Sequence, residues 1–68
     1  MKTYKATFAN GKTISRRYGQ GWSDDEAWGH FVWLIRKHPS CNGSDVKTEE
    51  SRSGRPDFVY TRAFEPYK

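Results

Sequence analysis

The sequence predicts a small α+β domain, with its elements in the order β-β-α-β-β and one helix packed on one face of an antiparallel sheet. Apolar and polar residues alternate over residues 3–18 and again over residues 58–64, whereas residues 23–37 carry apolar side chains at helical spacing. No internal repeat or linker interrupts the 68 residues. A single domain over residues 1–68 is therefore expected.

Residues 3–18 are predicted to form a β-hairpin. A two-residue loop would place Ile14 on the polar side of the hairpin, whereas a three-residue loop at residues 9–11 places it opposite Ala6. The longer loop is therefore predicted, with Gly11 at the left-handed position, where the lack of a Cβ atom removes the steric penalty. The apolar side of the hairpin then carries Tyr4, Ala6, Phe8, Ile14 and Tyr18.

A helix is predicted to begin after Ser23, because Ser23 and Glu26 have the spacing of a capping box. Pro39 disfavours helical geometry at the residue before it, so the helix is expected to end near Lys37. At 100° per residue, one stripe faces the core. Its residues are Ala27, Trp28, Phe31, Leu34 and Ile35.

The second half of the chain is less regular. Residues 45–50 are polar and hold Val46 as their only large apolar side chain, so whether they pair as a strand stays open. A turn is predicted over residues 51–56, followed by a strand in which Phe58, Tyr60 and Phe64 alternate with smaller or polar residues.

Composition argues against several classes of protein. No apolar run reaches the roughly 18 residues of a membrane span, so a cytoplasmic protein without membrane contact is expected. The single cysteine, Cys41, excludes an internal disulfide. His30 and His38 are roughly 12 Å apart along the predicted helix, too far to share a metal ion. Without a catalytic motif, the chain is expected to be non-enzymatic and to use no cofactor.

Positive charge is concentrated in the hairpin, because residues 1–18 hold five Lys or Arg side chains and no acid. Basic and hydroxyl side chains share the strand face turned away from the helix, which favours contact with nucleic-acid phosphates. Exposed strands also carry such residues for solubility alone. The candidate nucleic-acid-binding residues are Lys5, Thr7, Thr13, Ser15, Arg17 and Arg62, and Arg52 and Arg55 would join them if they lie on the same side.

Trp33 points away from the predicted core face and indicates a second candidate surface. Its neighbours at helical spacing complete a candidate protein interface, made of His30, Trp33, Arg36 and Lys37. The alternative is that Trp33 folds onto the loop at Pro39 or onto Pro66 and Tyr67. An exposed Trp33 would favour a protein partner or a homodimer over DNA, and whether the chain is a monomer or a homodimer stays open.

One segment resembles a known family. Its pattern is Tyr4-x-Ala6-x-Phe8, Gly11-Lys12, Ser15-Arg16, then Ser23-x-x-Glu26-Ala27 leading into a helix. It resembles the hairpin-then-helix start of integrase-type domains that read DNA with a sheet, over less than half of the chain. Those domains place three strands before the helix, whereas two precede it here, so no binding residue is transferred.

Two functions follow from the sequence. The first is a non-enzymatic binding module that contacts nucleic acid through the basic sheet face. The alternative is a protein-binding inhibitor or adaptor that uses the aromatic helix surface. A short, basic, Trp-rich chain of this kind looks like the accessory proteins of phages and other mobile elements.

Overall fold

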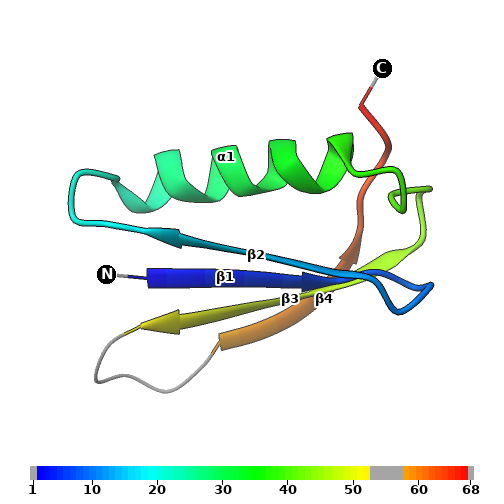
Figure 1. Cartoon of the computed structure of the whole chain (residues 1–68), viewed down its shortest axis with the longest axis horizontal. Coiled ribbons are helices and arrows are strands. Elements are labelled where there is room, and N and C mark those ends of the chain that lie inside the picture. Colours follow the sequence, from blue (N-terminus) through cyan, green and yellow to red (C-terminus); the bar gives the residue numbers. More distant parts are fainter. Residues whose placement is uncertain (1, 53–57, 68) are drawn as a thin grey trace.

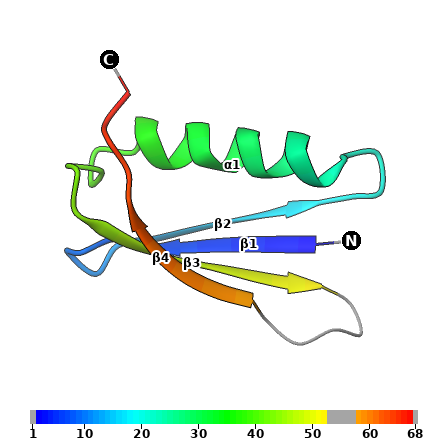
Figure 2. The ribbon, with the colours of Figure 1, turned by 180° about the vertical axis from the view of Figure 1, so that it is seen from behind.

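The structure, a computed structural model that describes residues 2–52 and 58–67, confirms the predicted α+β fold (Figure 1). The elements in chain order are β1 (Lys2–Thr7), β2 (Thr13–Tyr18), α1 (Asp24–Lys37), β3 (Asp45–Arg52) and β4 (Phe58–Ala63). The strands form one antiparallel sheet in the order β2-β1-β3-β4. Both views show α1 along one face of the sheet (Figures 1 and 2). We call this the inner face and the opposite one the outer face.

The hairpin has the predicted three-residue loop. Ala6 pairs with Ile14 across β1 and β2. The Phe8 N–H donates to the Lys12 carbonyl at 2.8 Å, and the Gly11 N–H donates to the Phe8 carbonyl at 2.9 Å. Gly11 has a φ of 89°, the left-handed conformation that favours glycine. Loop length therefore fixes which hairpin side chains reach the core.

The predicted ends of α1 are also confirmed. The Ser23 hydroxyl accepts a hydrogen bond from the Glu26 N–H at 3.2 Å, which satisfies one of the unpaired amides of the first turn. Acidic residues occupy that turn, and Arg36 and Lys37 occupy the last one, so both ends complement the helix dipole. At the other end, the His38 N–H donates to the Ile35 carbonyl.

The Ser23→Ala variant is expected to lose about 1 kcal/mol of unfolding free energy, because the first turn of α1 loses its cap. Urea denaturation followed by circular dichroism measures this loss. Ser23→Asp keeps a capping oxygen and should stay near the original stability, and Ser51→Ala, at an exposed position of β3, controls for surface change. Equal stability of the Ala and Asp variants would show that the cap contributes nothing.

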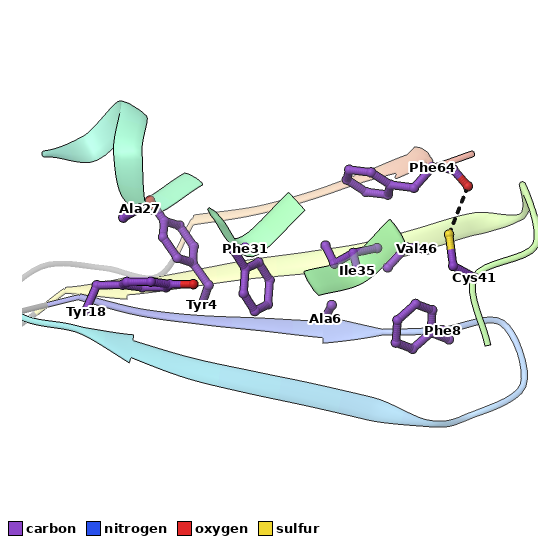
Figure 3. Packing of buried hydrophobic residues seen from close by; sticks show 10 residues of the cluster. All are labelled: Tyr4, Ala6, Phe8, Tyr18, Ala27, Phe31, Ile35, Cys41, Val46 and Phe64. Atoms are coloured by element: carbon purple, nitrogen blue, oxygen red, sulfur yellow. Dashed lines mark hydrogen bonds between the residues drawn. The ribbon is translucent and has the colours of Figure 1, made fainter. Parts of the chain in front are cut away.

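The core lies between α1 and the inner face (Figure 3). Its buried members are Tyr4, Ala6, Phe8, Tyr18, Ala27, Phe31, Ile35, Cys41, Val46 and Phe64. Of the predicted core stripe of α1, Ala27, Phe31 and Ile35 are buried, whereas Trp28 and Leu34 at its margins are half-buried. The amphipathic pattern thus identified the correct face of the helix.

The polar segment whose pairing was open does form a strand. β3 pairs with both β1 and β4 and extends two residues beyond the predicted 45–50. Val46 and Thr48 fill its inner face at 2% exposure each. The turn predicted over residues 51–56 falls largely outside the described residues, as do the side chains of Phe58 and Tyr60.

Candidate functional site

Strand register places five of the predicted nucleic-acid-binding residues together on the outer face. In the β1–β2 pairing, Lys5 lies opposite Ser15 and Thr7 lies opposite Thr13, while Arg17 lies opposite Thr3. Opposed residues of an antiparallel pair point to the same face, and here that face is opposite the buried Ala6. Thr7 is half-buried, and the other four predicted residues are exposed.

Two further cations of the hairpin are exposed. Lys12 lies in the turn beside this surface, whereas Arg16, on the edge strand β2, pairs with the buried Tyr4 and so lies on the inner side of the sheet. The Arg16 guanidinium donates to the carbonyl of the preceding Ser15 at 3.1 Å. We define the hairpin surface as Lys12 together with Lys5, Thr7, Thr13, Ser15 and Arg17.

Not every cation of the hairpin contributes to that surface. Lys2 is 8% exposed, and its ammonium forms an ion pair with Asp24 on the inner side. Of the five positive charges of this segment, four are exposed, and two of these, Lys5 and Arg17, lie on the outer face. The placement of Lys2 follows from its position, because it shares the even-numbered side of β1 with Tyr4 and Ala6.

The expectation that Arg62 extends the same face is wrong. Arg62 pairs with Val46, which is buried on the inner face, so Arg62 lies on the helix side of the sheet. Its guanidinium lies 5.2 Å from the centre of the Phe64 ring. Arg52 also lies on the inner side, where it forms an ion pair with Asp24 at 3.2 Å, and Arg55 is outside the described residues.

Beyond the hairpin the outer face is mixed in charge. On β3, Lys47 and Glu49 point outward, and their charged groups lie 3.7 Å apart. Glu49 also lies opposite Lys5 in the β1–β3 pairing. Positive charge therefore predominates on the β1–β2 half, which borders solvent at β2, and is partly neutralised toward β3.

The helix surface predicted from Trp33 is exposed and larger than expected. Trp33 is 41% exposed, with the His30 ring stacked at 5.9 Å and the Lys37 ammonium 4.4 Å from its ring centre. Trp22, 40% exposed, packs against His30 at 5.2 Å between ring centres. Lys37 also lies 5.5 Å from the ring of Tyr67, which is 51% exposed.

These side chains form what we call the aromatic stripe: Trp22, His30, Trp33, Lys37 and Tyr67. His30 is fixed from below by a 2.8 Å hydrogen bond between its Nδ1 and the Tyr18 hydroxyl. Sequence analysis did not identify Trp22 as a surface residue, because it lies in a glycine-containing loop where neither helical nor strand periodicity applies. The alternative in which Trp33 folds away onto the tail does not hold, since the ring keeps its exposure.

Arg36, the fourth predicted interface residue, binds the C-terminal tail through hydrogen bonds. Its Nε donates to the Glu65 carbonyl at 3.0 Å, and its own carbonyl accepts from the Tyr67 N–H at 2.9 Å. The guanidinium lies 5.6 Å from the centre of the Tyr67 ring. Arg36 thus holds Tyr67 beside the end of α1 and contributes indirectly to the aromatic stripe.

A polar cluster closes the end of the core near the start of α1. Arg52 forms ion pairs with Glu50 and Asp24, and Asp24 also pairs with Lys2. Burial and the adjacent Glu50 carboxylate, which accepts the Tyr4 hydroxyl hydrogen bond, raise the pKa of Tyr4 to about 12. A pocket of about 270 Å³ lies among these groups and Trp28.

The histidine and cysteine near the helix end have local packing roles. His38 stacks on Phe8 at 4.6 Å, and its Nδ1 accepts from the Ser40 N–H at 3.1 Å. The Cys41 thiol donates to the Phe64 carbonyl at 3.2 Å (Figure 3). Across residues 2–52 and 58–67, no three His, Cys, Asp or Glu side chains are placed to hold a metal ion.

Comparisons with protein-family models, with curated proteins and with solved structures found no match. Function is therefore argued from the geometry of the two surfaces. Within the described part of the chain, no helix has the length and apolar character needed to cross a membrane.

Proposed function

We propose that this chain is a non-enzymatic nucleic-acid-binding module that contacts phosphates through its hairpin surface. One observation carries the proposal: three cations, Lys5, Lys12 and Arg17, are exposed on or beside the outer face of a hairpin whose sequence contains no acid. Lys and Arg supply the salt-dependent part of nucleic-acid affinity, and the neighbouring Thr and Ser hydroxyls can donate hydrogen bonds to phosphate oxygens.

The arrangement suits the sugar-phosphate backbone better than base edges. On the outer face, Lys5 and Arg17 lie among short hydroxyl side chains, with Lys12 in the adjoining turn. A flat surface of this kind offers charge and hydrogen-bond donors without a protruding element that would enter a groove. Binding is therefore expected to depend strongly on salt and weakly on sequence.

Fluorescence anisotropy with a short labelled duplex and a single strand of the same sequence tests the proposal. With three phosphate contacts, the logarithm of the duplex binding constant should fall against the logarithm of salt concentration with a slope of about −2.5 to −3. The Lys5→Ala/Arg17→Ala double variant should bind about tenfold or more weakly and reduce the magnitude of that slope by about 2.

Arg62→Ala is the matched control, because it removes one cation from the inner side of the sheet and should leave binding unchanged. Two results would overturn the proposal. One is no micromolar binding of either probe at about 50 mM salt. The other is an equal loss in the control and in the double variant. In either case the protein-binding alternative would take its place.

A further inference from the structure

We infer that the aromatic stripe is a self-complementary surface through which two copies of this chain form a symmetric dimer with antiparallel α1 helices. The stripe carries three exposed aromatic rings, and large aromatic side chains dominate the energetics of most protein interfaces. Two features of α1 point to a second copy as the partner: the order of charges along the exposed side, and the spacing of its residues.

Charge along the exposed side of α1 changes sign from one end to the other. Glu26, His30, Trp33 and Lys37 lie within a 60° arc at 100° per residue, roughly opposite the buried Phe31 and Ile35. The acidic member is in the first turn and the basic member in the last. An antiparallel second copy therefore brings unlike charges together at both ends, whereas a parallel copy would bring like charges together.

A single alignment of the two α1 helices brings both pairs of residues together. When the two-fold axis crosses α1 at the level midway between residues 31 and 32, Glu26 lies beside the partner's Lys37 and His30 lies beside the partner's Trp33. The same axis brings the end of α1 that holds Trp22 next to the partner's end that holds Tyr67. A two-fold interface needs this reciprocity, because each contact must occur twice.

Interface size predicts the strength of the dimer. The rings of Trp22, Trp33 and Tyr67 are 40%, 41% and 51% exposed. At about 200 Å² per ring side chain, they offer roughly 250 Å² of aromatic surface per copy. Two copies would together bury roughly 500 Å² of aromatic surface, well below the roughly 1,200 Å² at which standard-size specific interfaces begin, so a weak dimer with a dissociation constant in the upper micromolar range is expected. The dimer leaves both outer faces free, because α1 covers the inner face (Figure 1), whereas strand register places Lys5 and Arg17 on the outer face.

Sedimentation equilibrium of the full chain across a concentration series tests this inference without nucleic acid. The original sequence should show a monomer–dimer equilibrium in the upper micromolar range. Trp33→Ala should raise the dimer dissociation constant about tenfold or more, and circular dichroism should show that α1 is retained, since alanine favours helix. Val59→Ala, at an apolar residue 48% exposed on the sheet, should leave the constant unchanged.

A charge swap supplies the decisive comparison. Glu26→Lys and Lys37→Glu should each weaken the dimer, and the variant carrying both should recover it. The two positions lie roughly 16 Å apart along α1, beyond contact within one copy, so recovery requires contact between copies. Both swaps oppose the helix dipole, so a purely structural effect would be worst in the double variant.

Three results would overturn the inference. A monomer at every concentration would leave the aromatic stripe to some other partner. A dimer weakened by Val59→Ala but unaffected by Trp33→Ala would place the contact on the sheet. Failure of the double swap to recover association would exclude the antiparallel register.

Discussion

The Phe31→Ala variant is expected to lose about 3 to 5 kcal/mol of unfolding free energy. Phe31 is 0% exposed at the centre of the core, and its ring stacks on Tyr4 at 5.4 Å between ring centres. Removing the ring leaves a cavity between α1 and the sheet. Domains of 68 residues have a total stability of about 3 to 10 kcal/mol, so this loss removes a large share of the stability of the fold.

Urea denaturation followed by circular dichroism, with near-ultraviolet spectra of the aromatic residues, measures this loss. Trp33→Ala is the matched control, because it removes a larger ring two positions further along α1 on the exposed side. Measured at concentrations where the chain is monomeric, it should lose only about 1 kcal/mol, from its contacts with the His30 ring and the Lys37 ammonium. A Phe31→Ala protein that unfolds cooperatively at the original midpoint would contradict the packing described here.

Most of the fold was predictable because local rules and burial agree. Gly11 fixes the loop length, which then decides whether Ile14 joins the apolar side of the hairpin. Ser23 and Pro39 delimit the helix, and its apolar stripe identifies the buried face. In each case two independent signals, one from the backbone and one from side-chain periodicity, give the same answer.

The third strand was less predictable because it is central yet polar. Its inward positions carry Thr48 and Glu50, which read as solvent-facing in sequence. In the structure Thr48 is buried, and Glu50 is satisfied by Tyr4 and Arg52. Partners for such groups come from other strands, and single-sequence periodicity does not contain that information.

The candidate surfaces were predictable in part for the same reasons. The hairpin residues follow from strand parity, and Trp33 follows from the helical period. The alternation of residues over 58–64 also indicates that Arg62 lies on the inner side of the sheet, because it shares the even-numbered positions with Phe64. The outward placement of Glu49 could be predicted only once β3 was known to be a strand. The position of Trp22 depends on the path of a loop, for which the sequence has no periodic pattern.

Stability should fall steeply at alkaline pH because of Tyr4. The core and the Glu50 carboxylate raise the pKa of this phenol to about 12, above the value of about 10 in an unfolded chain. Below about pH 10 both states keep the proton, and the stabilising effect is fully present. Between about pH 10 and pH 12 the unfolded state releases it first, so the free energy of unfolding falls by about 2 to 3 kcal/mol.

Urea midpoints of the original protein and of Tyr4→Phe, measured from about pH 8 to about pH 12, test this prediction. The variant lacks the ionisable hydroxyl, so its stability should be lower near neutral pH but decline less in the alkaline range. Burial also raises the pKa of Tyr18, so some alkaline loss should remain in the variant. Tyr67→Phe, at an exposed tyrosine of the tail, should follow the original curve. Parallel curves for the original and the Tyr4→Phe protein would mean that the Tyr4 hydroxyl ionises as easily in the folded state as in the unfolded chain.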